Sequence, residues 1–232
     1  MKPGKKFKLL QKVKFSKNLH AIVQKIYSDG TRKLEFNLEK QALDNEIERI
    51  GMAPLPPYIK NSPATLEEYQ TVYASTKGSI AAPTAGLHFT KDLLNKIKKA
   101  GIEIVYITLH VGRGTFQPIK TENILEHKMH AEWITISKTA ANKLNEAKKS
   151  GRKIYAVGTT SVRALESAAK DNQIQDFSKN TSLYIYPGYK YKFIDGMITN
   201  FHLPKSTLLL LISALAGKTF IFKAYNEAIK HE

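Results

Sequence analysis

The chain has 232 residues, of which 42% are hydrophobic and 24% charged. These values exclude an intrinsically disordered chain, and the length allows one large or two small domains. The absence of cysteine excludes disulfides, thiolate zinc sites and cysteine nucleophiles. Thirty-six Lys and Arg against twenty Asp and Glu give a formal net charge of +16, which favours polyanionic partners such as nucleic acid.

The lysine-rich segment 1–14 has no apolar core behind it, so it is not typical of a signal peptide. The longest apolar run, residues 208–216, is too short to cross a bilayer. We therefore expect a cytoplasmic protein without membrane contact.

Residues 1–57 are expected to form strands. Two β-favouring runs, 20–27 and 33–36, flank an Asp-Gly pair, which predicts a hairpin because both turn residues tolerate positive φ. The proline-rich segment 52–57 predicts a domain boundary, since proline fixes φ and removes a backbone donor. Residues 1–28 contain eight lysines and no acid, which favours RNA contact, with a merely lysine-rich surface as the alternative.

Beyond residue 57 helical and strand patterns alternate. Helices are predicted at 63–74, 90–100, 137–149, 161–170, 206–216 and 218–229, and strands at 102–109, 153–157, 183–186 and 193–198. The alternation predicts an α/β domain over residues 58–232, with largely parallel strands joined by helical crossovers. In such folds, functional loops follow the carboxyl ends of strands. Polar, glycine-rich segments stand at those places: 110–115, 158–161 and 199–206.

Two of the polar loops combine glycine with a basic side chain. The sequence APTAGLHFT, residues 82–90, places His88 close to a helix start, where unpaired N–H groups favour anions. The sequence HVGRGTF, residues 110–116, lets the backbone approach a ligand while Arg113 supplies several donors. Its spacing is not that of a dinucleotide-binding loop. A simple helix start and a simple β-turn remain the structural alternatives.

The segment EHKMHAE, residues 126–132, brings His127, His130 and Glu132 together. Such groups bind zinc, but this histidine spacing is unspecific, so acid–base or hydrogen-bonding roles are the better interpretation.

Two further polar loops begin predicted helices. The sequence GTTSVRALE, residues 158–166, holds more polar groups than capping requires. The sequence TNFHLPKST, residues 199–207, precedes the most apolar helix. A structural role explains each histidine taken singly, but five polar loops in one α/β domain favour a functional site.

Six blocks, residues 82–90, 109–116, 127–133, 157–167, 186–189 and 199–209, are similar in sequence, order and spacing to those of one enzyme family. The chain thereby resembles the S-adenosylmethionine:tRNA ribosyltransferase-isomerases of queuosine biosynthesis. The resemblance implies a barrel-like α/β domain and a small all-β barrel, which residues 1–57 would form. Members of the family are longer, so the chain would lack the segment that begins the α/β domain and the usual C-terminal tail.

The resemblance also implies an activity. The ribosyl group of S-adenosylmethionine is transferred and isomerised onto 7-aminomethyl-7-deazaguanine at the tRNA wobble position, giving epoxyqueuosine, adenine and methionine. S-adenosylmethionine is then a substrate, and no cofactor or metal is expected. The partners would be tRNA and S-adenosylmethionine, and the enzyme a monomer. A chain that only binds tRNA, and a split-gene fragment that needs a partner polypeptide, are the alternatives.

This chemistry needs proton transfer and donors for a transient oxyanion. The catalytic residues that we predict are His130 and His202 first, then His88 and Glu132. The predicted substrate-binding residues are Thr84, His110, Arg113, Thr115, His127, Thr159, Thr160, Arg163, Glu166, Asn200 and Lys205. The predicted RNA-binding residues are Lys5, Lys6, Lys8, Lys12 and Lys14, which would neutralise phosphates.

Overall fold

A computed structural model of the chain describes residues 6–28, 30–52, 55, 59, 65, 67–79, 81–112, 119 and 121–231. The chain divides into two compact units, Met1–Ala53 and Pro54–Glu232. Lys5, Arg113 and Thr115 from the predicted site lie outside the described residues.

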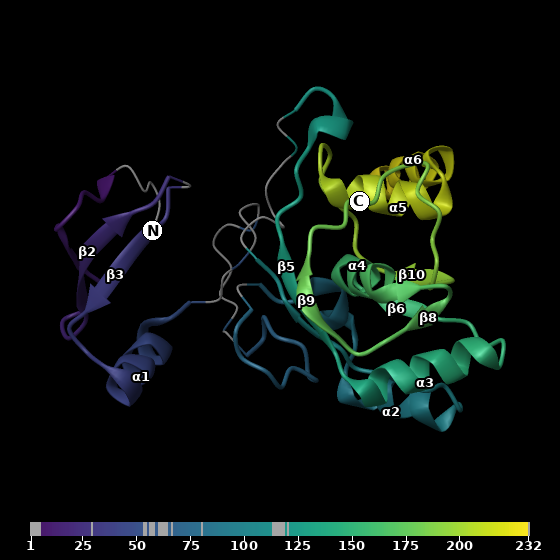
Figure 1. The fold of residues 1–232 in the computed structure, drawn as a ribbon, viewed down its shortest axis with the longest axis horizontal. Coiled ribbons are helices and arrows are strands. Elements are labelled where there is room, and N and C mark those ends of the chain that lie inside the picture. The colour runs from purple at the N-terminus through teal and green to yellow at the C-terminus, as the bar shows by residue number, and fades with distance from the viewer. Residues whose placement is uncertain are drawn as a thin grey trace. The chain divides into compact units, whose positions relative to one another are not determined.

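The first unit is built on an antiparallel sheet, in which β1 (Lys12–Lys14), β2 (His20–Ile26) and β3 (Arg32–Phe36) follow one another in chain order (Figure 1). Strands β2 and β3 confirm the predicted hairpin, and Gly30 in its turn has a φ of 83°. The sheet is held by a small apolar core of Val13, Leu19, Ala21 and Val23.

The first unit also contains a helix, α1 (Lys40–Ile50), so the expectation of an all-β unit is wrong. The segment is rich in Gln, Ala, Leu, Glu and Arg, which favour helix over strand. The Glu46 carboxylate of this helix accepts hydrogen bonds from Ser16 Oγ at 2.5 Å and from Arg49 Nε at 2.8 Å, which fastens α1 to the β1–β2 loop. In the described residues β1 and β3 are edge strands, and the sheet does not close into a barrel.

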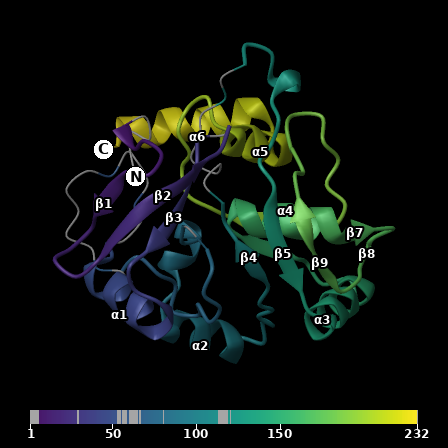
Figure 2. The same ribbon diagram turned by 60° about the vertical axis from the view of Figure 1, so that its left-hand side comes forward.

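The second unit is α/β, but its strands are not largely parallel as expected. Strands β6 (Tyr155–Val157) and β10 (Gly196–Ile198) pair in parallel. Strands β4 (Thr108–His110), β5 (Glu132–Ile136) and β9 (Phe177–Thr181) form an antiparallel sheet, seen side by side in Figure 2. Parallel neighbours need a crossover connection, usually a helix. The described part of the β4–β5 connection holds only the short 3₁₀ helix η4 (Ile124–Glu126).

Most of the predicted helices are present near their predicted bounds. They are α2 (Lys91–Lys99), α3 (Lys138–Lys149), α4 (Thr159–Ala168), α5 (Thr207–Ala216) and α6 (Lys218–Lys230). The predicted N-cap of α2 is confirmed, since the Thr90 hydroxyl accepts the N–H of Leu93 at 3.1 Å. Serine caps α3 and α5 in the same way, through Ser137 and Ser206.

Two predicted elements are absent from the described residues. Residues 63, 64 and 66 of the predicted helix at 63–74 lie outside the described residues, and residues 67–74 are not helical, so the prediction is wrong there; Thr65 and Glu68 instead bond to each other's backbone N–H. The predicted strand at 183–186 is also wrong, because the Leu183 carbonyl accepts from the Arg163 side chain instead of from a neighbouring strand.

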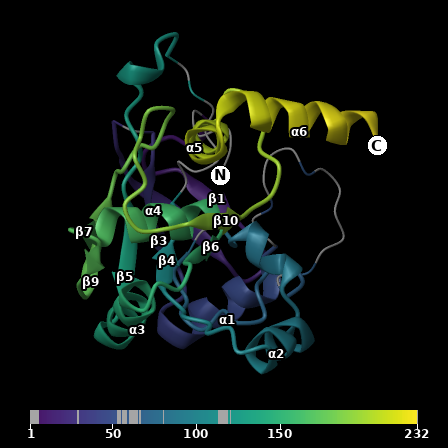
Figure 3. The same ribbon diagram turned by 90° about the vertical axis from the view of Figure 1, so that its right-hand side faces the viewer.

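Helix α4 lies at the centre of the second unit. It contacts β4, β6 and β9, and its buried residues run from Thr159 to Glu166 with one interruption. Figure 3 shows α5 and α6 joined at a sharp bend, where Gly217 has a φ of 84°. No single helix of the described residues is long and apolar enough to cross a membrane, and α5 with α6 would qualify only as a pair, bent by 115°.

Candidate functional site

Three of the predicted polar loops meet at the carboxyl ends of the parallel strands β6 and β10. Gly158, which follows β6, donates its N–H to the carbonyl of Ile198, the last residue of β10, at 2.9 Å. A 3₁₀ helix, η2 (Thr84–His88), lies against this point, since a Cβ on Gly158 would stand 4.0 Å from the Ala85 Cβ. The fold therefore brings together three segments: the one that begins α4, the one that precedes α2 and the one that follows β10.

His88 and Asn200 are joined directly across this point. The His88 Nε2 and the Asn200 Oδ1 are 2.7 Å apart, although the residues are 112 positions apart in the chain. Because an amide oxygen only accepts, this bond places the proton of the neutral ring on Nε2. The Nδ1 of His88 is then the nitrogen that can accept a proton.

Helix α4 begins at this site. Gly158 is its N-cap with a φ of 87°, a conformation that glycine adopts without strain. Thr159 and Thr160 follow and are both buried. The unpaired N–H groups of a helix start, with its positive dipole end, attract negative charge.

His202 lies in the loop after β10 and is uncharged at neutral pH, because burial lowers the pKa of its imidazole to about 4. Its Nε2 is 3.2 Å from the Thr199 hydroxyl, and its backbone N–H donates to the Tyr225 hydroxyl at 2.6 Å. The Phe201 ring packs edge-on against the Tyr225 ring, with centroids 4.8 Å apart. Helix α6 thus holds the loop that carries His202.

The other predicted loops gather around β4 and β5. Lys205 follows His202 in the same loop, and its carbonyl accepts the N–H of Ile119 at 2.9 Å. That bond joins the loop after β10 to the segment that follows β4. His110 ends β4 beside Trp133 of β5, and its buried Nδ1 has no hydrogen-bond partner within the described residues. His130 is exposed, and His127 is partly buried.

Glu132 of β5 and Arg163 of α4 form a buried ion pair, in which each side chain is 5% exposed. The Arg163 Nε also donates to the Leu183 carbonyl at 3.0 Å. Burial lowers the pKa of the Arg163 guanidinium and Glu132 opposes that shift, so the group stays charged. The remaining nitrogen, Nη2, is buried and finds no hydrogen-bond partner among the described residues.

Glu166 has a structural role, which corrects its prediction as a substrate ligand. Its carboxylate is 1% exposed and accepts four hydrogen bonds. The donors are the Tyr189 hydroxyl and the backbone N–H groups of Lys192, Phe193 and Ile194, at 2.8 to 3.1 Å. A carboxylate has about four accepting positions, so none is left for a ribose hydroxyl.

Sequence reasoning missed several residues of this region. Thr199 and Tyr225 hold His202, and Tyr184 packs against both His127 and Tyr186. The signals for the tyrosines were their density after residue 183 and, for Tyr186, its place in the block 186–189. Thr199 and Tyr225 are brought together by the folding of α6 onto the loop, which no local pattern reveals.

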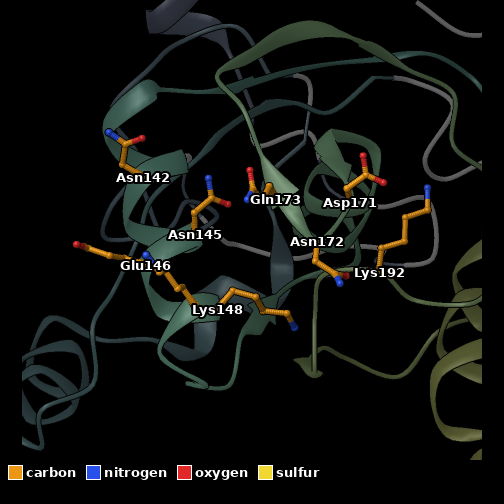
Figure 4. Close-up of a pocket in the computed structure, with 9 residues that line it drawn as sticks. Asn142, Asn145, Glu146, Lys148, Asp171, Asn172, Gln173 and Lys192 are labelled. Carbon is orange, nitrogen blue, oxygen red and sulfur yellow. The ribbon is translucent and has the colours of Figure 1, made fainter.

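A cavity of about 970 Å³ lies elsewhere, between α3 and the hairpin of β7 (Ala169–Lys170) and β8 (Gln173–Ile174) (Figure 4). Among the described residues that line it there is no predicted site residue. Two of its polar side chains have structural partners, since Asn145 bonds twice to the Ile174 backbone and Lys148 donates to the Phe193 carbonyl. Nowhere in the described ranges do three His, Asp or Glu side chains gather in a way that could hold a metal ion.

Comparison with known proteins gives consistent matches. The family described as "Queuosine biosynthesis protein" matches residues 1–232. The chain is 50% identical to the S-adenosylmethionine:tRNA ribosyltransferase-isomerase of Halothermothrix orenii, over 100% of this chain and 68% of that protein. It is 48% identical to the enzyme of the same name from Clostridioides difficile, over 99% of this chain and 68% of that one.

A solved structure is also similar. The crystal structure of the S-adenosylmethionine tRNA ribosyltransferase of Thermotoga maritima matches with a TM-score of 0.53 and 33% identity, over 99% of this chain and 63% of that one. The chain thus spans about two thirds of the length of the relatives that it matches.

Proposed function

Since this chain belongs to the queuosine biosynthesis protein family, we propose that it carries the S-adenosylmethionine:tRNA ribosyltransferase-isomerase activity for which its relatives are named. The observation that carries the proposal is identity of 48 to 50% through at least 99% of the chain. That similarity gives no support to the alternatives, a chain that only binds tRNA and a fragment that awaits a partner polypeptide.

The reaction joins two substrates and uses no cofactor. The ribosyl carbons of S-adenosylmethionine pass to the aminomethyl nitrogen of 7-aminomethyl-7-deazaguanine at the tRNA wobble position. The C–N bond to adenine and the C–S bond to methionine both break. The tRNA then carries epoxyqueuosine, and adenine and methionine are released.

The sulfonium acidifies the neighbouring C5′ hydrogens of the ribose, so a general base can remove one. His202 is uncharged at neutral pH, because burial holds the pKa of its imidazole at about 4, so the ring has a nitrogen lone pair for this proton. The imidazolium that forms is correspondingly a strong acid, which suits protonation of the departing adenine. His88, hydrogen-bonded to Asn200 of the loop that also carries His202, is the second acceptor.

Oxyanions form when the amine adds and the ring closes, and they need donors in fixed positions. The start of α4, with the buried Thr159 and Thr160, lies at the same end of β6 as His88. Thr84, Asn200 and Lys205 come from the adjoining loops, and His127 and the exposed His130 stand at the β5 side. We assign substrate binding to these groups, with His130 as a further proton carrier.

The first unit is the candidate tRNA-binding surface. Lys12 and Lys14 are exposed on β1 and flank the buried Val13, so both side chains project from the same face of the sheet. Lys6 and Lys8 are exposed just before them. Cations on one face are suited to the phosphates of an RNA backbone.

Membership of the same family also suggests the form of each unit, the cellular compartment and the oligomeric state. We propose that the second unit forms part of a barrel-like α/β domain, and that the first unit's sheet forms part of a small β-barrel. A tRNA substrate favours action in the cytoplasm, and we propose that one copy of the chain is the working unit.

The test is mass spectrometry of tRNA nucleosides after incubation of the purified chain with S-adenosylmethionine and tRNA that bears the aminomethyl-deazaguanine. We expect epoxyqueuosine and an equal amount of adenine, with a lower yield from His88→Ala and His202→Ala. A folded chain that binds this tRNA and gives no product would overturn the proposal.

A further inference from the structure

Three aromatic side chains form a cluster next to Leu183, the residue whose carbonyl accepts from Arg163. The rings of His127 and Tyr184 have centroids 5.5 Å apart in an edge-on arrangement, and those of Tyr184 and Tyr186 have centroids 5.1 Å apart. They come from two segments distant in sequence, one after η4 and one after β9. All three side chains are partly exposed, so the cluster is not a closed core.

The Tyr184 hydroxyl in this cluster is buried and has no hydrogen-bond partner in the described part of the chain. Nearby tyrosines differ, because the Tyr189 hydroxyl donates to Glu166 at 3.1 Å and the Tyr191 hydroxyl donates to the Leu211 carbonyl at 2.8 Å. Buried tyrosine hydroxyls usually find such partners. The Tyr184 hydroxyl is therefore a polar group that can bond to a ligand.

The Arg163 side chain offers a second donor that has no hydrogen-bond partner in the described residues. Its Nε is bonded to the carbonyl of Leu183, the residue before Tyr184, while its buried Nη2 lacks a partner within the described ranges. The charge of Arg163 is already balanced by Glu132. The vacant N–H group therefore suits an uncharged acceptor, such as a ring nitrogen, a carbonyl or a hydroxyl, better than a second anion.

Aromatic faces next to a few unfilled polar atoms are typical of sites for flat heterocycles. Ring faces stack on the aromatic side chains, and the polar edge bonds to fixed donors and acceptors. A phosphate or an aliphatic ligand would use the donors but could not stack on these rings.

We propose that Tyr184, with His127 and Tyr186, binds a flat nitrogen heterocycle, and that the Tyr184 hydroxyl and the Arg163 Nη2 bond to its polar edge. The identity of the heterocycle rests on the proposed function, which supplies two sources. One is the adenine of S-adenosylmethionine, and the other is the 7-deazaguanine of the tRNA.

The experiment is equilibrium dialysis of the full chain with free adenine and, separately, with free 7-aminomethyl-7-deazaguanine. The variants are Tyr184→Leu, which removes the ring, and Tyr184→Phe, which removes only the hydroxyl. We expect Tyr184→Leu to weaken binding of one base about 10-fold or more, and Tyr184→Phe to weaken it about 5-fold. The base that is affected identifies the source of the ring.

Tyr27→Leu is the matched control, because Tyr27 is a half-exposed tyrosine of the first unit whose ring lies under the Lys25 ammonium group. It should leave binding of both bases unchanged. Circular dichroism and a melting curve would establish that each variant is folded. Wild-type affinity of both folded Tyr184 variants for both bases would overturn the inference.

Steady-state kinetics separate this inference from the proposed function. Base binding that depends on Tyr184, in a chain that forms no epoxyqueuosine, would leave the inference standing and overturn the function. Product formation in which Tyr184→Leu changes KM for neither substrate would leave the function standing and overturn the inference.

Discussion

At the scale of single residues, the buried pair of Glu132 and Arg163 fixes the junction of β5 and α4. We predict that Glu132→Gln lowers the free energy of unfolding by about 3–5 kcal/mol, because it leaves the Arg163 charge buried without compensation. Urea denaturation followed by circular dichroism measures this change. The double variant Glu132→Gln with Arg163→Met should recover most of the loss, since it removes the stranded charge as well.

Equal stability of Glu132→Gln and the wild type would contradict this role for the pair. The same variants also report on catalysis. If Glu132 acts by positioning Arg163, the double variant regains stability but not turnover, because it still lacks the Arg163 guanidinium.

His202 makes stability depend on pH. Its pKa is about 4 in the folded chain and 6.5 as the ordinary value, so the unfolded chain binds the proton more readily between these values. Titration of His202 therefore leaves the free energy of unfolding unchanged above pH 6.5 and lowers it as the pH falls from 6.5 toward 4. We predict that His202→Gln removes up to about 3 kcal/mol of that pH dependence.

Urea unfolding at pH 7 and at pH 4.5 measures the effect, with His231→Gln as the control on an exposed histidine. Identical pH dependence in His202→Gln and the wild type would show that His202 is not buried as an uncharged ring.

The sequence made several side chains recognisable as candidates, but it did not reveal their partners. His88 and Asn200 stood out in two loops, and their contact depends on the pairing of β6 with β10. Glu166 was predicted as a ligand because it lies in the polar segment 158–166, but its four hydrogen-bond donors come from residues 189–194. The unpaired hydroxyl of Tyr184 is visible only after folding.

At the scale of elements, Gly158 sets the turn from β6 into α4. We predict that Gly158→Ala costs about 1–2 kcal/mol, because its φ of 87° is unfavourable for any residue with a Cβ. Gly217→Ala is the matched variant, since Gly217 has a φ of 84° and nothing within 4 Å of an added Cβ. Both should lose similar stability in thermal melts, and only Gly158→Ala should lower turnover.

A much larger loss for Gly158→Ala than for Gly217→Ala would contradict a purely backbone cause. The same turnover in both variants would contradict the placement of the site at the start of α4.

Helices were predicted better than strands, for a physical reason. The caps and apolar spacing of α2, α3 and α5 are local signals, and serine or threonine begins each one. Strand pairing depends on distant residues, so β5 and β9 could not be recognised as antiparallel neighbours from their sequences. Helix α1 was not predicted, because the hairpin signal before it led to the expectation of strands through residue 57.

At the scale of the whole molecule, the net charge of +16 should govern association with tRNA. We predict that Lys12→Gln with Lys14→Gln weakens tRNA binding and reduces the slope of log affinity against log salt by about 1 to 2. Filter binding over a range of salt concentrations measures this slope. Lys98→Gln with Lys99→Gln, exposed on α2 of the second unit, is the charge-matched control.

An unchanged salt slope in the Lys12 and Lys14 variant, or an equal change in the control, would contradict a specific role for the first unit. The sheet that carries these lysines was predictable from its hairpin, whereas its open form and its helix were not.

The central claim is that the chain transfers the ribosyl group, and not the methyl group, of S-adenosylmethionine. Two labelled substrates test it most directly, one with ¹³C in the ribose and one with ¹³C in the methyl group, each incubated with the chain and tRNA. We predict that the ribose label enters the tRNA nucleoside and that the methyl label stays in the released methionine. Methyl label in the nucleoside, or ribose label that remains attached to adenine, would contradict the claim.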